Sequence, residues 1–241
     1  MRRDVLQHGV ARTCRGAAWG WVARPHPSYT GRMIVGTVTG PQADPRSSSH
    51  PLLGPRAVLV PVKSFADAKR RLGTALADGD RLALVRDMAE RVLAAAAPLA
   101  VAVVCDDTAV ADWARSRGAL VVWEPGRGLN GAVEVGVERL AGMGVVEVTV
   151  AHGDLPMASG LGALERFDGI TLVPDHRDDG TNVIRLPVRS GFRFSYGPGS
   201  FERHLSECRR LGMPVRVLRV PDLSRDVDWP ADLRWARPGN G

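Results

Sequence analysis

The sequence predicts an α/β fold with a mostly parallel central sheet, and three features of the chain support this. From residue 57 onward, short apolar runs of strand length alternate with longer segments of helical period. The apolar runs are hydrophobic throughout, which is typical of strands buried on both faces of a parallel sheet. Regular alternation of strand and helix favours right-handed crossovers, which place helices on both faces of the sheet.

The first part of the pattern contains two strands and two helices. The apolar run 57–62 predicts the first buried strand. Residues 81–97 predict a helix, because apolar side chains recur on one side and Arg, Asp and Glu on the other. The run 100–105 predicts the second strand, and residues 108–117 predict a second helix that Gly118 would end.

The second part of the pattern repeats the same alternation. Residues 119–123 and 145–151 predict strands, with a helix at 130–141 between them. Further strands are expected from the apolar runs at 170–173, 182–186 and 215–220. Two more helices are expected, one at 200–211 and a short last one that opens at Pro230. The whole pattern fits one sheet with helices on both faces.

The N-terminal part of the chain differs in composition from the rest. Residues 1 to about 55 show no helical or strand period and are rich in Arg, Gly, Pro and Ser. Such composition is typical of segments that do not bury a core. We therefore expect a disordered basic extension at 1–55, one folded domain at 56–237 and a short tail at 238–241.

The positive charge of the protein is concentrated in that extension. The 241-residue chain has a formal net charge of +6, and residues 1–50 hold seven Arg and two Asp. Five of the six net charges therefore lie outside the predicted domain. The predicted domain is therefore nearly neutral, and nucleic-acid binding by the folded part loses its main support. We expect no nucleic-acid partner.

Cysteine usage and hydropathy indicate a cytoplasmic protein. Cys14, Cys105 and Cys208 are an odd number with no CxxC or metal-ligand spacing, which favours free thiols in a reducing compartment. The longest apolar run, 92–105, has 14 residues, which is too short to span a bilayer. No apolar segment typical of a secretory signal stands near the N-terminus. We expect no membrane partner.

Candidate functional residues stand directly after the predicted strands, because ligands of such folds bind beyond the carboxyl ends of the strands. Asp154, in the sequence Gly-Asp-Leu-Pro, follows the fourth strand. A carboxylate there suits Mg²⁺, which takes few protein ligands and keeps phosphate oxygens and water. The same Asp would also serve as a helix N-cap or turn residue, and the sequence alone leaves both interpretations open.

A second acidic motif lies near the C-terminal end. Asp226 and Asp228 flank Val227, and alternate residues of an extended segment point the same way. We therefore expect both carboxylates on one side, where they and Asp154 would form a divalent-cation site. The alternative is helix capping, because Asp228 stands two residues before Pro230.

The loop after the first strand carries the two lysines of the chain. Lys63 and Lys69 lie six positions apart, followed by Arg70 and Arg71. The loop contains neither GxxxxGK[ST] nor GxGxxG, which excludes P-loop and Rossmann dinucleotide sites. Cationic side chains can still neutralise a triphosphate in place of backbone amides. A solvated helix start would explain the same charges.

Two small turns are candidates for anion binding. One surrounds Thr181, and the other runs from Gly197 into the helix that starts at Ser200. Free amides and a hydroxyl at a helix start suit an anion, and this is compatible with Ser200 as an N-cap. His152 is a candidate for positioning a ligand, whereas His204, in the middle of a predicted helix, is expected to be structural.

Seven short motifs stand in order between residues 57 and 236. They are Val60-Pro61-Val62-Lys63, Ala68-Lys69-Arg70-Arg71-Leu72, Leu129-Asn130-Gly131-Ala132, Gly153-Asp154-Leu155-Pro156, Asp179-Gly180-Thr181-Asn182, Tyr196-Gly197-Pro198-Gly199-Ser200-Phe201 and Asp226-Val227-Asp228. Together they resemble the CofC/FbiD guanylyltransferase family, which acts in the biosynthesis of the deazaflavin coenzyme F-420. Several motifs in the right order are much more specific than any one of them.

The resemblance implies a single GT-A-like, Rossmann-like nucleotidyltransferase domain and a defined reaction. Members of the family transfer GMP from GTP to phosphoenolpyruvate, 2-phospho-L-lactate or 3-phosphoglycerate and release pyrophosphate. The Arg-rich, Lys-poor composition suggests a GC-rich source, in which phosphoenolpyruvate is the expected acceptor. The implied partners are GTP, this phospho-acid and a downstream deazaflavin transferase that receives the product.

The resemblance also assigns the catalytic residues, which are Lys63, Lys69, Asp154 and Asp228. Asp154 and Asp228 would hold Mg²⁺ on the triphosphate, with Asp226 as a supporting or second ligand. Lys63 and Lys69 would bind the triphosphate and the leaving pyrophosphate. Metal and cationic side chains suit this reaction, because its difficulty is to bring two anions together in an in-line geometry.

The remaining assignments concern the nucleotide and the acceptor. By resemblance, Asn130 would lie near the nucleotide, and Thr181, Gly197 and Ser200 would cradle the phosphate and carboxylate of the acceptor. The acceptor phosphate is already an anion near neutral pH, so no strong general base is needed to generate the nucleophile.

Parts of the sequence are also compatible with other functions. Another Mg²⁺-dependent nucleotidyltransferase, such as a molybdopterin guanylyl- or cytidylyltransferase, is disfavoured because Ser64-Phe65-Ala66-Asp67 replaces a Gly-rich loop. A glycosyltransferase would place its DxD motif in the middle of the sheet, not at the chain end. A non-catalytic nucleotide-binding module and a nucleic-acid-binding protein driven by the basic extension are the alternatives from other classes.

Overall fold

The computed structural model describes residues 53–164 and 166–236. The extension expected at 1–55, apart from its last three residues, and the tail expected at 238–241 lie outside the described residues. The predicted domain boundaries therefore stay predictions.

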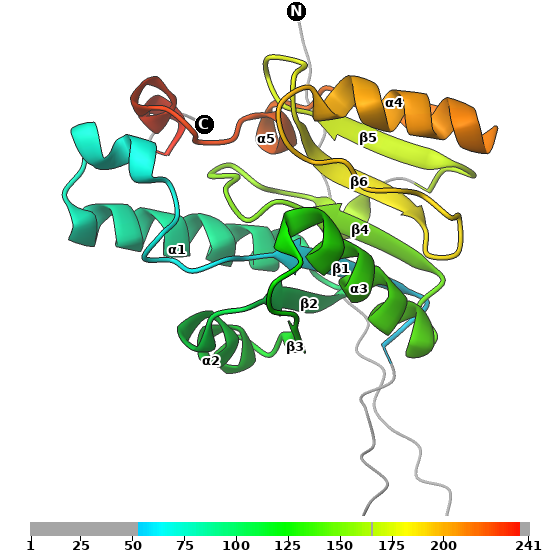
Figure 1. Ribbon diagram of the computed structural model, residues 1–241, viewed down its shortest axis with the longest axis horizontal. Coiled ribbons are helices and arrows are strands. Elements are labelled where there is room, and N and C mark those ends of the chain that lie inside the picture. The colour runs from blue at the N-terminus through cyan, green and yellow to red at the C-terminus, as the bar shows by residue number, and fades with distance from the viewer. Residues whose placement is uncertain (1–52, 165, 237–241) are drawn as a thin grey trace, which may run out of the picture. The chain divides into compact units, whose positions relative to one another are not determined.

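A seven-stranded sheet forms the centre of the fold, in the strand order β3-β2-β1-β4-β6-β5-β7 (Figure 1). Strands β1 to β4 are mutually parallel where they pair, β7 is parallel to β5, and β6 runs antiparallel to β4 and β5. The strands are β1 (Arg56–Pro61), β2 (Ala100–Cys105), β3 (Leu120–Trp123), β4 (Glu147–Ala151), β5 (Ile170–Pro174), β6 (Thr181–Pro187) and β7 (Val215–Val217). The predicted α/β class with a mostly parallel sheet is confirmed.

The helices are α1 (Asp78–Ala95), α2 (Thr108–Ser116), α3 (Gly128–Gly142), α4 (Ser200–Leu211) and the short α5 (Pro221–Ser224). Helices α1 to α4 fall close to the predicted segments, whereas the short α5 was not predicted. Three 3₁₀ segments, η1 (Arg70–Thr74), η2 (Leu161–Ala163) and η3 (Pro230–Trp235), complete the described elements. Helix α1 begins three residues before the expected position 81. Asp78 and Asp80 occupy its first turn, where carboxylates favour a helix start.

The two faces of the sheet are covered by different helices. Val58 and Val60 of β1 pack in the cluster that contains the apolar sides of α1 and α2, whereas Leu59 packs in the cluster of α3 and α4. Helix α3 approaches β1 closely, because a Cβ at Gly136 would lie 2.6 Å from Leu59 Cδ2. Burial of a side chain such as Leu59 contributes about 1.5–3 kcal/mol to stability.

The pairing of β4 with β6 brings distant segments to one edge of the sheet. The end of β4 lies beside the start of β6, since Ala151 pairs with Val183 and the His152 amide donates to the Asn182 carbonyl at 3.0 Å. The Val227 amide donates to the Asp154 carbonyl at 3.2 Å, so the C-terminal segment also lies there. None of the helices in residues 53–164 and 166–236 is both long and apolar enough to cross a membrane.

Candidate active site

Lys69 joins two of the predicted carboxylates in one ionic group. Its Nζ atom donates to Asp154 Oδ2 and to Asp228 Oδ1, each at 2.5 Å. The three residues come from the loop after β1, the loop after β4 and the segment before η3. The structure therefore brings together at one point residues that are 85 and 159 positions apart.

The loop that carries Lys69 is held by a buried arginine of α1. The Arg81 guanidinium donates to the carbonyls of Ala66 and Ala68, and its side chain is 9% exposed. Lys69 itself adopts a left-handed conformation with φ 55°, directly before η1. This conformation costs energy in a residue with a side chain. The hydrogen bonds from Arg81 to the loop carbonyls and the ion pairs with the two carboxylates offset this cost, and they orient the Lys69 side chain.

Electrostatics favour the charged forms of Lys69 and Asp154. Burial by itself would lower the pKa of the Lys69 ammonium, but the carboxylates of Asp154 and Asp228 outweigh burial and raise that pKa above its usual range. Burial would likewise raise the pKa of Asp154, but Lys69 holds it below its usual range. A charge pair removed from water needs such mutual compensation.

Asp226 stands behind this ionic group. It is 6% exposed, and its Oδ1 lies 3.5 Å from Asn182 Nδ2 and 3.7 Å from His176 Nδ1. Burial raises the pKa of Asp226 to about 7, and the charges of Asp154 and Asp228 add to this effect. A carboxyl with such a pKa binds a proton near neutral pH unless a cation approaches it.

The alternative interpretation of the aspartates as helix caps does not describe what they do here. Neither Asp154 nor Asp228 caps a helix, because both carboxylates face Lys69. Asp232 takes the capping role, since its Oδ2 accepts from the amides of Asp228 and Trp229 at 3.2 and 2.9 Å. Arg177 in turn donates to Asp232 at 3.1 Å. This arrangement orients Asp228, and the sequence analysis did not identify it.

A cavity of about 190 Å³ opens beside the ionic group at the carboxyl ends of β1 and β4. It is lined by Pro61, Val62, Lys63, Ala68, Lys69, Val85, Ala89, Leu129, His152, Gly153 and Asp154. A smaller hollow adjoins it and extends along the ends of β2 and β3 to Asp106 and Glu124. A larger hollow, about 760 Å³, lies between α1, β2 and the end of α2 and contains no predicted site residue. We assign the site to the 190 Å³ cavity because the predicted charges line it.

The turn before α4 is shaped by two glycines and one arginine. Gly197 and Gly199 have φ of 116° and 70°, a region that favours glycine. Arg203 binds the carbonyls of this turn, with Nη2 to Ser195 at 2.7 Å and Nη1 to Pro198 at 2.6 Å. The arginine thus holds the carbonyl oxygens, which would repel an anion, on its own side.

Thr181 and Ser200 lie on either side of that turn and are almost fully buried, at 2% and 1% exposure. The loop before Thr181 is joined to the turn because the Gly199 amide donates to Asp179 Oδ1 at 3.0 Å. The Ser200 amide donates to the Gly197 carbonyl at 3.0 Å. The three residues predicted to bind the acceptor therefore lie on segments that contact one another.

Asn130 connects this turn to α3. Asn130 is the second residue after Gly128, where the helix begins. Its Oδ1 accepts a hydrogen bond from the Tyr196 amide at 2.7 Å. The Tyr196 ring packs 4.8 Å from the ring of His152, which lines the cavity. Tyr196 thus links Asn130, which is predicted to lie near the nucleotide, to the turn that is predicted to bind the acceptor.

Two further features bear on metal binding. The Asp154 Oδ1 atom is buried and has no hydrogen-bond partner among the described residues. Within the same residues, no group of three or more His, Cys, Asp or Glu side chains is arranged to hold a metal ion.

Cys105 and Cys208 are buried free thiols, as expected.

The fold is the one found in solved structures of nucleotidyltransferases. A nucleotidyl transferase from Methanothermobacter superposes with a TM-score of 0.55 at 14% identity, covering 75% of this chain and 95% of that one. A cytidylyltransferase from Leptospira borgpetersenii gives a TM-score of 0.50 at 10% identity, covering 74% and 83%. At such low identity, these structures show the shared fold.

The chain belongs to the family of CofC-like guanylyl transferases, whose family model matches residues 56–235. A phosphoenolpyruvate guanylyltransferase from Sphaerobacter thermophilus is 38% identical over 186 residues, covering 73% of this chain and 89% of that one. A protein of the same name from Rubrobacter xylanophilus is 37% identical, covering 73% and 90%. The expected family is therefore confirmed, and the chain is an enzyme of the nucleotidyltransferase class.

Proposed function

We propose that this protein transfers GMP from GTP to phosphoenolpyruvate with release of pyrophosphate. The observation that carries the proposal is the ionic group of Lys69, Asp154 and Asp228 beside the 190 Å³ cavity. The names of the relatives support phosphoenolpyruvate as the acceptor. In the transfer, a phosphate oxygen of the acceptor attacks the α-phosphorus, the new P–O bond forms, and the bond to the pyrophosphate oxygen breaks.

The residues at the cavity fit Mg²⁺ as the cofactor. Asp154 Oδ1 is a buried oxygen without a partner among the described residues, and Asp228 presents a half-exposed carboxylate next to it. Mg²⁺ takes one or two carboxylates together with substrate phosphates, so it does not need a cage of three protein ligands. Asp154 and Asp228 would hold the ion, with Asp226 in support. When bound, Mg²⁺ would neutralise the triphosphate and favour in-line displacement.

The lysines have separate tasks in this proposal. Lys69 is held between two carboxylates before any substrate binds, so its ammonium is already oriented when the triphosphate arrives. Lys63 lies exposed at the cavity and would bind the triphosphate and the departing pyrophosphate. Asn130, at the start of α3, would contact the nucleotide through its amide nitrogen, since its oxygen is bound to Tyr196.

The acceptor would bind against the turn before α4. Thr181 and Ser200 would offer their hydroxyls and Gly197 its backbone amide, which are neutral donors for a phosphate and a carboxylate. A cytoplasmic location, and transfer of the product to a deazaflavin transferase in coenzyme F-420 synthesis, belong to the same proposal.

The test is pyrophosphate release by the purified full-length protein with Mg²⁺, each of four nucleoside triphosphates, and each of the three candidate acceptors. We expect release with GTP and phosphoenolpyruvate together, and none when either is omitted. A parallel reaction includes the downstream deazaflavin acceptor and its transferase, which would consume the product as it forms. Release with a different acceptor or a different triphosphate would correct the substrate, and no release with any combination would defeat the proposal.

A further inference from the structure

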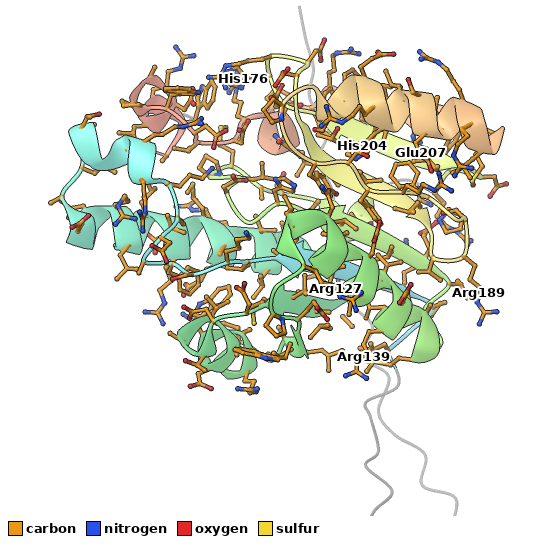
Figure 2. All side chains as sticks on the ribbon, viewed as in Figure 1. Arg127, Arg139, His176, Arg189, His204 and Glu207 are labelled. Carbon is orange, nitrogen blue, oxygen red and sulfur yellow. The ribbon has the colours of Figure 1, made fainter. Side chains whose placement is uncertain are left out.

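His204 is predicted from the sequence to be structural, but its contacts indicate a further role. It lies in α4, on the side that faces the sheet, and is fully buried (Figure 2). Both nitrogens of its ring have a partner. Nε2 accepts from the Ser195 amide at 3.0 Å, and Nδ1 lies 3.0 Å from Thr181 Oγ1.

These two contacts fix the tautomer of the ring. A backbone amide can only donate, so the Ser195 amide requires a lone pair on Nε2. In a neutral imidazole, the proton is then on Nδ1. Nδ1 therefore donates to the Thr181 hydroxyl oxygen.

The donated hydrogen bond determines what Thr181 can do. A hydroxyl has one proton and can accept as well as donate. When its oxygen accepts from His204, its own proton stays available for another acceptor atom. An anion is the natural partner of such a donor, because hydrogen bonds to charged acceptors are the stronger ones. His204 thus prepares Thr181 as a donor without touching the ligand itself.

His204 also connects the three segments that carry the predicted acceptor residues. It follows Ser200 by one helical turn on α4, it bonds Thr181 at the start of β6, and it bonds Ser195 two residues before Gly197. A shift of any of these segments would break at least one of its bonds. The ring therefore fixes the relative positions of the three.

We propose that His204 is a positioning residue for the acceptor phospho-acid, which acts by holding the Thr181 hydroxyl as a hydrogen-bond donor and by fixing the turn at Gly197. This inference rests on the proposed function, since it takes the acceptor to bind at Thr181. Its chemistry requires only a small phosphorylated carboxylic acid at that place.

The surroundings keep the ring neutral. Burial lowers the pKa of His204 to about 4, and the positive charge of Arg203 acts in the same direction. Glu207 on the same helix opposes these effects, and His152, at the end of β4, adds to them. The Tyr196 ring packs against it at 5.1 Å without adding charge.

The tautomer can be measured on the unmodified protein. Long-range ¹H–¹⁵N correlation spectra distinguish an imidazole protonated on Nδ1 from one protonated on Nε2. At pH 7, in the absence of substrates, we expect one buried histidine with the proton on Nδ1, whose signals disappear in His204→Gln. A proton on Nε2 would overturn the proposal. If His204→Gln does not fold, selective assignment through the neighbouring Thr181 signals replaces it.

The kinetic test separates positioning from general stability. We expect His204→Gln and Thr181→Val each to raise the KM for phosphoenolpyruvate about tenfold and to change the KM for GTP less than twofold. In the double variant the two effects should be less than additive, because His204 acts in part through Thr181 and in part through the Ser195 amide. Cys208→Ala, one turn further along α4 and equally buried, is the control for lost packing and should not change the ratio of the two KM values.

The possible failures are distinct. Equal rises in both KM values, additive effects in the double variant, or a selective effect of Cys208→Ala would overturn the positioning role while the enzyme remains a guanylyltransferase. If the wild-type protein releases no pyrophosphate with any acceptor, the proposed function fails, and the inference fails with it.

Discussion

The two halves of the site are built from different chemistry. The half at Lys69, Asp154 and Asp228 consists of full charges that neutralise one another. The half at Thr181 and His204 consists of neutral hydrogen bonds around a glycine turn. Removal of one charge leaves the others uncompensated in a partly buried place, whereas loss of one neutral bond mainly shifts a position. Changes in the charged half should therefore affect catalysis and stability strongly, and changes in the neutral half should be smaller and specific for the acceptor.

The largest effect is expected from Asp154→Asn. The variant keeps the shape of the side chain but removes the charge that pairs with Lys69 and that, in the proposed function, would hold Mg²⁺. We expect kcat to fall by about 1,000-fold or more, which corresponds to about 4 kcal/mol. Steady-state kinetics measures this, with circular dichroism to verify the fold. Asp112→Asn, on the exposed side of α2, is the control, and retention of full activity by Asp154→Asn would refute the metal assignment.

Lys69→Met should reduce stability as well as activity. It leaves the carboxylates of Asp154 and Asp228 close together without a counter-charge, at a cost of about 2–3 kcal/mol, which is less than for a fully buried pair because Asp228 is half-exposed. Urea unfolding of this variant and of Lys63→Met measures the difference, and the exposed Lys63 should have little effect on stability. Mg²⁺ should restore part of the lost stability of Lys69→Met. Equal stability of the two variants would mean that the ionic group contributes nothing to the fold.

The neutral half should make stability depend on pH. Because the folded-state pKa of His204 is about 4 and the unfolded-state value is near 6.5, the unfolded chain binds the proton more readily. The stabilisation is complete above pH 6.5 and is lost as the pH falls toward 4, by at most about 3 kcal/mol. Chemical unfolding between pH 4 and 7 should show this slope in the difference between the wild type and His204→Gln, because protonation of Asp226, whose pKa is raised to about 7, acts in the opposite direction in both proteins. A slope of the same size in His204→Gln would assign it to other groups.

The smallest effect is expected from Gly199→Ala, compared with Gly191→Ala. The two glycines have nearly the same φ, 70° and 71°, so both substitutions should cost about 1 kcal/mol of stability. Gly199 lies in the turn before α4, and an added Cβ would lie 3.3 Å from Arg203 Nη1, whereas at Gly191 it would meet nothing within 4 Å. We expect only Gly199→Ala to raise the KM for the acceptor. If Gly191→Ala does the same, the turn has no special role.

The sequence predicted the fold well because the signals of the parallel strands are local. Each apolar run is long enough to be recognised alone, and each is followed by a helical period. The antiparallel direction of β6 was not predicted, since a buried strand has the same composition in either direction. The left-handed conformation of Lys69 was not predicted either, because tertiary contacts stabilise it against its local cost.

The charged half of the site was easier to predict than the neutral half. Asp154 and Lys69 stand after strands, and topology brings such positions to one edge of the sheet. Arg81, Arg203 and Asp232 could not be identified, because an Arg or Asp on a helix looks like a solvated charge in the sequence. His204 was predicted to be structural, and only its two bonding partners indicate more.

In the proposed function, the acceptor phosphate attacks the α-phosphorus of GTP at the Lys69–Asp154–Asp228 group. ³¹P NMR of the reaction mixture tests this reaction most directly. With the purified protein, Mg²⁺, GTP and phosphoenolpyruvate, we predict two coupled phosphorus signals of a new phosphoanhydride, in equal amount to pyrophosphate and absent in Asp154→Asn. Conversion of GTP to GDP and inorganic phosphate, or the same phosphoanhydride signals from Asp154→Asn, would contradict it.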